Sequence, residues 1–480
     1  MIRPDFRLII LCCIVVLLSI SCNKEKTQKV KIAVTTTDLT IKNINVSVSL
    51  MVNPESIIIS EAKIDSTGKA TLEFNIPGPT FAYFELGSRG VSLYLEPGYD
   101  LKVILDTIRD KTISFSGKGS EPNNYNSQIS KIYKTFERKG FFGELTPYQF
   151  IARLDSLRND FASFHLRYCD STNLAKRTSR ILELNNKLML ISFKQNFLLI
   201  HPIDSTSNDQ YPEQLLNISK EIPFDDDLLS FRMDNYAMVL LFYLDLEIKK
   251  PCRDGNKGIK NIDELEPAII NDSILKNRKY TEGVREFLIG RNIYSAMKSS
   301  GLTPVLDSLF IGFKKSNPTS DYLPQLQKLA DKCLAISPGS VAPDIIGTTV
   351  DGKSFSLNEL KGKVVYIDVW ATWCGPCREE FSFSKKIQQQ FEKNDNVVFL
   401  FVSIDQDKAA WRKMVTYEKE LKGMHINLNE EQIRIKYLIG GVPWYILIDH
   451  KGKIVNAKAA RPSSGKVENE IRELLKKIKS

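Results

Sequence analysis

Residues 364–377 read VVYIDVWATWCGPC, an apolar run that ends in two cysteines separated by a glycine and a proline. The nearly continuous apolar run from Val364 to Trp370 predicts a strand buried on both faces of a mixed sheet. Proline costs no hydrogen bond in the first turn of a helix, so Pro376 predicts a helix that continues to about Glu392. The order of strand, Cys-x-x-Cys and helix favours redox chemistry over half of a zinc site, because no second pair of soft ligands lies nearby.

The two cysteines have different predicted roles. Cys374 lies at the helix N-terminus, where unpaired N–H groups and the helix dipole stabilise a thiolate, the attacking species in disulfide exchange. Cys377 follows one helical turn later, within reach to resolve a mixed disulfide, and its thiol is expected to be the more buried. The alternative to a redox pair is two structural thiols that do not react with each other.

Two residues outside the motif belong to the predicted site. Asp368 lies in the middle of the apolar run, where burial of an ionised carboxylate is costly, so its pKa should be raised. Such a carboxyl group could take the proton of Cys377 and return it; the alternative is a structural aspartate. Pro443 precedes a predicted strand, where a cis bond would present the backbone of Val442 to an incoming peptide, unless the segment is a plain turn.

The surrounding segment, 336–480, alternates strands and helices and is predicted to be one α/β domain. Asp351-Gly352 predicts a hairpin, and Phe383, Ile387 and Phe391 are expected on the buried face of the helix after the motif. Asn429 is predicted to cap a helix. Further strands are predicted at 397–403, 444–448 and 453–457, and further helices at 408–421 and at the C-terminus, with Val467, Ile471, Leu474, Leu475 and Ile478 on one stripe.

Residues 341–480 resemble the TlpA/ResA-type thioredoxin-like proteins, which are membrane-tethered, extracytoplasmic thiol–disulfide exchange proteins. The resemblance rests on 341–344 (VAPD), 360–363 (LKGK), Asp368, 370–377 (WATWCGPC) and 441–443 (GVP). It implies a thioredoxin fold in which Cys374 attacks, Cys377 resolves, Asp368 is the buried acid and Pro443 is the cis-proline. Trp373, Gly375, Pro376 and Val442 would contact the substrate.

The resemblance also implies the partners of the domain. Protein thiols and disulfides would be its substrates, apocytochrome c being one that the family uses, and no cofactor or metal is implied. The Gly-Pro pair between the cysteines matches thioredoxin, whose low potential favours reduction of substrates over oxidation or isomerisation. A reductase outside the cytoplasm needs electrons through the membrane, so a donor of the DsbD/CcdA kind is implied.

The N-terminus predicts where the protein works. Arg3 and Arg7 precede an apolar or small run, Leu8 to Ile20, which has the length of a secretory signal rather than of a membrane span. Ser19-Ile20-Ser21-Cys22 resembles a bacterial lipobox, so we expect 1–22 to be a signal segment with Cys22 lipidated. Ordinary signal cleavage and an uncleaved anchor are the alternatives. The mature protein is thus expected on the periplasmic side, anchored by lipid to a bacterial membrane.

Two further domains are predicted between the signal segment and residue 336. Residues 23–120 contain short β-branched or aromatic runs between turn signals, typical of a β-sandwich or barrel, and they resemble a β-rich domain of unassigned function found in bacterial lipoproteins. Residues 121–335 show helical periodicity and predict an all-α region. His165, His201, Cys169, Cys252 and Cys333 occur there without metal-ligand spacing, so they are interpreted as ordinary histidines and isolated thiols, with a Cys169–Cys252 bridge left open.

The amino-acid composition limits the class of protein to which the chain can belong. The 480 residues are 42% apolar and 26% charged, as in ordinary multi-domain globular proteins. The net charge of +9 comes from scattered residues rather than a basic block, so nucleic-acid binding is not expected.

Two rival functions stay open. A thiol peroxidase would need Thr-x-x-Cys, but Ala371 holds that position; a lipid-anchored ligand-binding protein would use the other two domains, with the thioredoxin domain ancillary.

Overall fold

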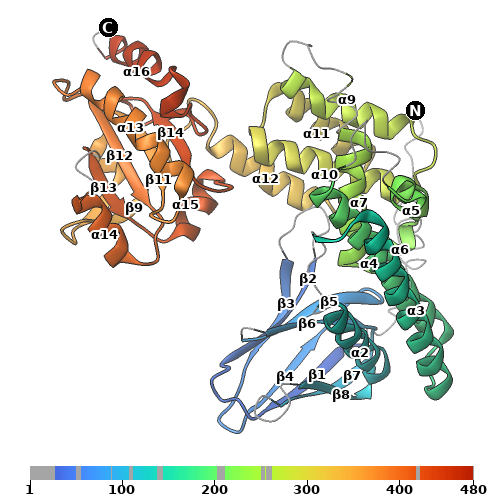
Figure 1. Cartoon of the computed structure of the whole chain (residues 1–480). Helices are drawn as coiled ribbons and strands as arrows, with labels where there is room; N and C mark the ends of the chain where they lie inside the picture. The colour runs from blue at the N-terminus through green and yellow to red at the C-terminus, as the bar shows by residue number, and fades with distance from the viewer. Residues whose placement is uncertain are drawn as a thin grey trace, which may run out of the picture. The chain divides into compact units, whose positions relative to one another are not determined.

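Strands and helices segregate along the chain in the computed structural model, which describes residues 28–49, 56–87, 89–106, 112–137, 144–202, 211–249, 255, 262–417 and 422–478. Their contacts divide the chain into two compact units. The first comprises the described residues within Met1–Pro251 and Asn277–Leu288, and the second those within Cys252–Lys276 and Ile289–Ser480. The predicted order of an all-β, an all-α and an α/β part is confirmed (Figure 1).

The β-rich part consists of two four-stranded sheets, in the orders β4-β1-β7-β8 and β3-β2-β5-β6. Alternate residues of β1 are buried, as expected for a strand with one face on a core, and the inward residues of both sheets form one apolar cluster. The strands are β1 (Val30–Thr36), β2 (Asn43–Ser49), β3 (Ser56–Lys63), β4 (Lys69–Phe74), β5 (Thr80–Leu86), β6 (Arg89–Leu95), β7 (Asp100–Asp106) and β8 (Thr112–Lys118). The last of these, β8, was not predicted, because its apolar residues are few.

The middle of the chain is helical, as predicted. In the first unit the helices are α2 (Ser120–Glu137), α3 (Pro147–Ser171), α4 (Lys176–Ile200), α5 (Glu213–Leu216), η3 (Ile218–Glu221), α6 (Asp226–Ser230), α7 (Asp234–Tyr243) and η4 (Leu244–Lys249). They continue with α9 (Ile262–Lys276), α10 (Glu282–Ser300), α11 (Pro304–Ser316) and α12 (Leu323–Ala335). Thr146 caps α3 through a capping box with Gln149, so the chain satisfies the first free N–H groups of this long helix itself.

The C-terminal part is a seven-stranded mixed sheet in the order β10-β9-β13-β12-β11-β14-β15. Its strands are β9 (Ile346–Thr349), β10 (Ser354–Ser356), β11 (Val364–Trp370), β12 (Val397–Ser403), β13 (Met424–Asn427), β14 (Trp444–Ile448) and β15 (Ile454–Asn456). Between them lie the helices η5 (Leu357–Leu360), α13 (Gly375–Gln390), α14 (Lys408–Tyr417), α15 (Glu430–Tyr437), η6 (Pro462–Ser464) and α16 (Val467–Lys476). The predicted hairpin at Asp351-Gly352 and the Asn429 cap are both present.

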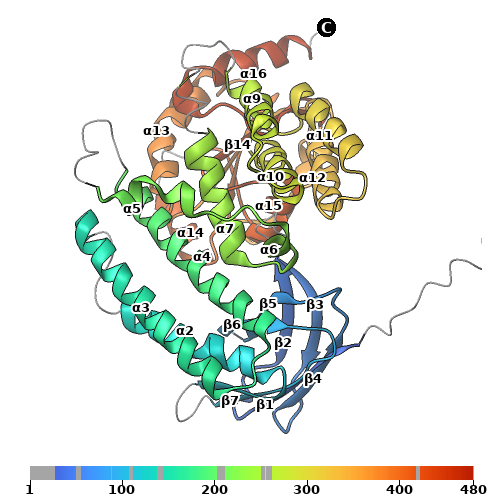
Figure 2. The same cartoon turned by 90° about the vertical axis from the view of Figure 1, so that its right-hand side faces the viewer.

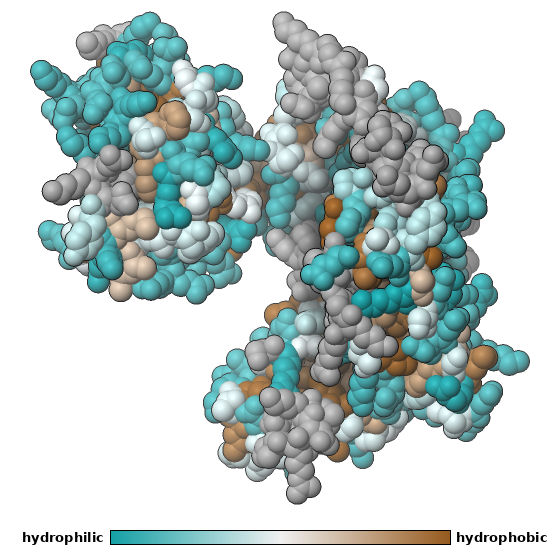
Figure 3. Space-filling model, viewed as in Figure 1, coloured by the Kyte–Doolittle hydropathy of each residue, from teal (hydrophilic) through white to brown (hydrophobic). Residues whose placement is uncertain are grey.

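Strand β11 holds the centre of this sheet. It pairs in parallel with β12 and antiparallel with β14, and all seven of its residues are buried. The predicted central strand is therefore confirmed. Its burial fits the view in Figure 3, where hydrophilic residues cover most of the visible face of the C-terminal domain.

One predicted helix face is partly wrong. Phe383 is 41% exposed on α13, although Ile387 and Phe391 are buried as expected. The buried aromatic residue is Phe381, whose ring meets Trp370 edge-to-face at a centroid distance of 5.1 Å. Steps of four residues drift around a helix of 3.6 residues per turn, so a stripe at 383, 387 and 391 does not stay on the face that meets the sheet.

Candidate functional site

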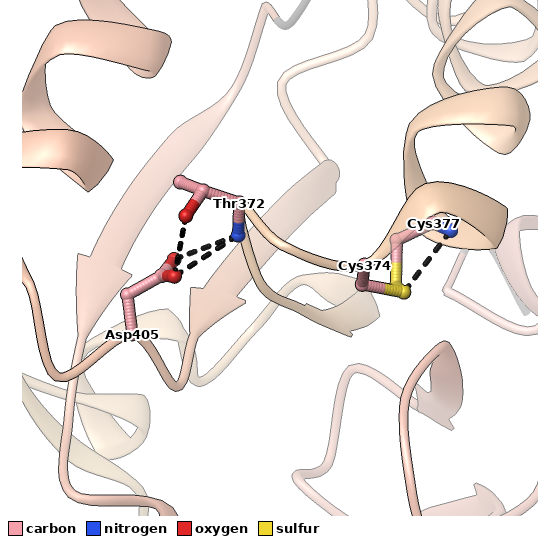
Figure 4. The surroundings of a disulfide bond; sticks show 4 residues. All are labelled: Thr372, Cys374, Cys377 and Asp405. Atoms are coloured by element: carbon pink, nitrogen blue, oxygen red, sulfur yellow. Dashed lines mark hydrogen bonds between the residues drawn. A yellow bond between two sulfur atoms is a disulfide. The ribbon is translucent and has the colours of Figure 1, made fainter.

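The two cysteines of the motif form a disulfide at the start of α13. Strand β11 ends at Trp370, and Cys374 is the N-cap residue of the helix, with Pro376 in its first turn. The S–S distance is 1.99 Å, and the backbone N–H of Cys377 donates to Cys374 Sγ across 3.2 Å (Figure 4). A helix N–H aimed at this sulfur is the donor that would stabilise a thiolate there after reduction.

The exposure of the two cysteines follows the predicted order, but the difference is small. Cys377 is 0% exposed and Cys374 is 4% exposed in this disulfide form. Cys374 is therefore almost as buried as Cys377 in this form, although it lies at a helix N-terminus. Trp373 is 65% exposed and is the prominent side chain of the motif.

Asp368 is buried at the centre of β11. The residue is 2% exposed, and neither carboxylate oxygen has a hydrogen-bond partner among the residues that the structure describes. Desolvation raises the pKa of Asp368 well above its usual range, and the nearby charge of Glu380 raises it further. The predicted rise of this pKa is confirmed, and a carboxyl group whose pKa is raised can give its proton and, once ionised, take one back.

Glu380 is a second buried carboxyl group that the sequence reasoning missed. It lies on α13 three residues after Cys377 and is 7% exposed. The backbone N–H and the hydroxyl of Ser463 donate to its two oxygens across 2.9 and 2.8 Å. Its spacing from Cys377 was the available signal, since residues three apart share a helix face.

A buried aspartate holds the loop that leads to Cys374. Asp405, 3% exposed, follows β12, and both of its oxygens accept from the backbone N–H of Thr372 at 3.0 Å. The Thr372 hydroxyl donates to Asp405 Oδ1 at 2.7 Å (Figure 4). Ser403 Oγ donates to Asp405 Oδ2 at 2.9 Å. Strands β11 and β12 are parallel neighbours, so their C-terminal ends lie side by side. This is why Thr372 and Asp405, 33 residues apart, meet here.

The remaining residues of the predicted site lie in two places. The Val442–Pro443 peptide bond is cis, directly before β14, and Val442 packs against the same apolar core that contains Cys374 and Cys377. Gly375 and Pro376 form the first turn of α13. The roles predicted for Trp373, Gly375, Pro376 and Val442 in substrate binding stay predictions.

Other sequence predictions concern metals, free thiols and the N-terminus. Within the described ranges no three His, Cys, Asp or Glu residues are arranged to hold a metal ion, and no helix there is long and apolar enough to cross a membrane. Cys169 and Cys333 are free thiols within the described ranges, and the Cys169–Cys252 bridge that the sequence left open involves a residue outside them. Cys22 and Cys252 lie outside the described residues.

Known proteins are similar to the C-terminal part of the chain. Residues 337–475 match the family model described as Redoxin. The thiol-disulfide oxidoreductase ResA of Bacillus subtilis (strain 168) is 30% identical over 126 residues, which are 25% of this chain and 66% of ResA. The thioredoxin-like protein YneN of the same organism is 29% identical over 147 residues, 30% of this chain and 85% of that protein.

Part of the chain is also similar to solved structures. A crystal structure described as a putative thiol-disulfide oxidoreductase from Bacteroides vulgatus is 35% identical, with a TM-score of 0.28, and the match covers 29% of this chain and 98% of that chain. The resemblance to ResA-type proteins is confirmed for the C-terminal domain, which is homologous to thiol-disulfide oxidoreductases. The chain spans about two thirds of the length of that ResA.

Proposed function

Starting from a C-terminal Redoxin domain homologous to ResA thiol-disulfide oxidoreductases, we propose that the protein reduces disulfides of other proteins with its Cys374–Cys377 dithiol. One arrangement carries the proposal: a vicinal disulfide at a helix N-terminus, close in sequence to a buried aspartic acid whose pKa is raised. A nucleophile, a resolving thiol and a proton acceptor are the three groups that two-step disulfide exchange requires.

The reaction begins with the reduced protein. The Cys374 thiolate attacks one sulfur of the substrate disulfide, forming a mixed disulfide and releasing the other substrate sulfur as a thiolate, which takes a proton. Cys377 then loses its proton to ionised Asp368 and attacks Cys374 Sγ. The bond between Cys374 and the substrate breaks, and the second substrate sulfur leaves as a thiolate, which takes a proton. The products are the Cys374–Cys377 disulfide, which is the form of this structure, and a substrate dithiol. Two electrons pass from the protein to the substrate.

Three features of the site support dithiol exchange over peroxide reduction. The Thr372 hydroxyl donates to Asp405 across 2.7 Å, so this proton is engaged away from any peroxide at Cys374. Ala371 occupies the position three residues before Cys374, where a peroxidase would carry its threonine. A cysteine one helical turn away from the nucleophile also suits intramolecular resolution of a mixed disulfide.

The place of action and the electron donor belong to the same proposal. Arg3, Arg7, the apolar run to Ile20 and Cys22 support export and attachment of a lipid to Cys22, which would hold the protein at the periplasmic side of a bacterial membrane. Reduction outside the cytoplasm consumes electrons, so the proposal includes a membrane donor of the DsbD/CcdA kind that regenerates the dithiol.

Full-length protein with Cys377→Ser tests this function. Without the resolving thiol, the mixed disulfide on Cys374 should accumulate, and its partners can be identified by mass spectrometry after non-reducing electrophoresis. Wild-type protein should reduce insulin disulfides in the presence of a dithiol reductant, and Cys374→Ser should not. A Cys377→Ser protein that captures no substrate, together with wild-type protein that reduces none, would disprove the proposal.

A further inference from the structure

A buried tyrosine, Tyr445, lies opposite Asp368 on the neighbouring strand. Asp368 of β11 and Tyr445 of β14 are paired in the antiparallel register, so their side chains leave the same face of the sheet about 5 Å apart. Tyr445 is 3% exposed, and its hydroxyl, like both oxygens of Asp368, has no hydrogen-bond partner among the described residues. One cross-strand pair at the centre of the sheet therefore contributes three buried polar atoms that the described protein groups leave unsatisfied.

A second tyrosine on the same face has a satisfied hydroxyl. Tyr366 precedes Asp368 by two residues on β11, and its ring stacks on that of Tyr445 at a centroid distance of 5.7 Å. The Tyr366 hydroxyl donates to the backbone carbonyl of Ala460 across 2.7 Å. The two stacked rings thus share one environment and differ in whether a protein group accepts the hydroxyl proton.

The helices that cover this face add further polar groups. Helix α16 packs against α13 and against β11 (Figures 1 and 2). Ser384 of α13 is 2% exposed, and its Oγ, like Glu470 Oε2 of α16, is a buried atom without a partner in the described part of the chain. Burial raises the pKa of Tyr366, and the charges of Asp368 and Glu470 add to this rise, so both acids lie near the same ring. The contact between the sheet and these helices is therefore polar at its centre.

Such a group of atoms matches the needs of a bound water molecule. A buried polar atom without a partner is costly, and ordered water that makes about three hydrogen bonds commonly satisfies such atoms. The Asp368 oxygens can accept, and the Tyr445 hydroxyl can donate. Burial raises the pKa of Tyr445, and the charges of Asp368 and Glu380 raise it further, so this group remains a phenol at neutral pH.

We propose that Tyr445 is a positioning residue, which holds a bound water molecule against Asp368, and that this water relays the proton between Cys377 and Asp368. The inference rests on the proposed exchange function. In the resolution step, the Cys377 S–H bond breaks and its proton passes to the water, while the water gives one of its own protons to ionised Asp368. The electron pair of the S–H bond stays on the Cys377 thiolate, which then attacks Cys374 Sγ. The Tyr445 hydroxyl donates to the water oxygen throughout and transfers no proton.

The titration of Asp368 is the first measurement, and several charged or titratable groups lie around the Asp368–Tyr445 pair. They are Tyr366 on β11, Glu380 on α13, Glu470 on α16 and Arg461 before η6. Tyr445→Phe leaves all four in place and keeps the ring that stacks on Tyr366. In the oxidised full-length protein, carboxyl carbon NMR should show the pKa of Asp368 higher by about one in this variant, because ionised Asp368 loses a donor.

Tyr366→Phe is the matched control. It removes a hydroxyl from the partner ring, but that hydroxyl donates to Ala460. The control should unfold at a lower urea concentration than the wild type, because the Ala460 carbonyl loses its donor, and Asp368 should titrate as in the wild type. An unchanged Asp368 titration in Tyr445→Phe, or an equal change in Tyr366→Phe, would overturn the proposal.

The second measurement follows the proton relay itself. Reduced full-length protein is mixed with Ellman's reagent and quenched in acid at increasing times, and peptide mass spectrometry follows the adduct on Cys374. In Tyr445→Phe the adduct should form at the wild-type rate and decay roughly tenfold more slowly, since only the attack by Cys377 needs the relayed proton. Decay at the wild-type rate would overturn the relay. If Cys377→Ser captures no protein substrate, the proposed function fails, while the change in Asp368 titration still supports the water beside Tyr445.

Discussion

Asp368 and Glu380 are two buried carboxyl groups of one site, and they differ in their hydrogen bonds. Ser463 donates to both Glu380 oxygens, whereas neither Asp368 oxygen has a partner in the described part of the chain. Burial raises the pKa of Asp368, and the charge of Glu380 raises it further. Ser463 therefore holds Glu380 in place, whereas Asp368 is the group that takes and returns a proton in the proposed exchange.

Asp368→Asn should separate stability from activity. The pKa of Asp368 in the folded protein lies above its unfolded value of 3.8. Asp368 therefore lowers the free energy of unfolding by an amount that is absent at low pH and grows as pH rises through the unfolded and toward the folded pKa. Asparagine carries no charge, so the oxidised variant should unfold at an equal or higher urea concentration than the wild type at neutral pH, and this difference should disappear in acid. Disulfide reduction should slow about a hundredfold without the proton acceptor. A variant that is clearly less stable yet exchanges at the wild-type rate would make Asp368 a structural residue.

Glu380→Gln should lower the pKa of Asp368. The charge of Glu380 is the electrostatic cause that raises this pKa, while Tyr366 from β11 and Tyr445 from β14 also couple to Asp368 and stay unchanged in the variant. Carboxyl carbon NMR of the oxidised protein should show Asp368 titrating at lower pH. Glu379→Gln, on the exposed side of α13, is the control and should leave the titration in place. An unchanged Asp368 titration in Glu380→Gln would contradict the coupling.

The two cysteines should differ in reactivity once reduced. Cys374 caps the helix and has an N–H donor on its sulfur, whereas Cys377 has no exposed surface. At neutral pH, iodoacetamide should therefore modify Cys374 at least about tenfold faster than Cys377. A time course by peptide mass spectrometry measures both rates, with unfolded protein as the reference for equal access. Equal rates in the folded protein, or faster modification of Cys377, would reverse the assigned roles.

The Thr372–Asp405 contacts should stabilise the redox loop. Thr372→Val removes the hydroxyl that donates to Asp405 and should cost about 1 kcal/mol of unfolding free energy. Asp405→Ala leaves three donors without their acceptor and should cost about 2–3 kcal/mol. Urea unfolding of oxidised protein measures both losses, and Thr372→Ser, which keeps the hydroxyl, should resemble the wild type. Asp405→Ala with wild-type stability would show that these bonds contribute nothing net.

Cys22→Ala tests the predicted anchor. A diacylated cysteine would supply the membrane attachment, so the variant should appear in the soluble periplasmic fraction or remain as an unprocessed precursor. Fractionation of cells followed by mass spectrometry of the N-terminus distinguishes these outcomes from the wild type. Unchanged processing and membrane retention of the variant would rule out lipidation at Cys22.

Local pattern was sufficient for the centre of the site. An apolar run of strand length before Cys-x-x-Cys and proline predicted β11, the loop and α13, because burial and helix initiation depend on adjacent residues. The same run predicted the raised pKa of Asp368, since burial in a strand of seven buried residues disfavours the charged form of a carboxyl group. The short strands β8 and β13 were missed, because their pairing with neighbours rather than their composition makes them strands.

Contacts between distant residues required the tertiary structure. Glu380 meets Ser463 83 residues away, and Asp405 meets Thr372 33 residues away. Each pair joins two elements whose relative placement depends on packing of the whole domain, which no local spacing encodes. The sequence by itself therefore determined which residues can carry the thiol chemistry. Only the tertiary structure decided which partners supply charge and hydrogen bonds to them, because those forces act across space and not along the chain.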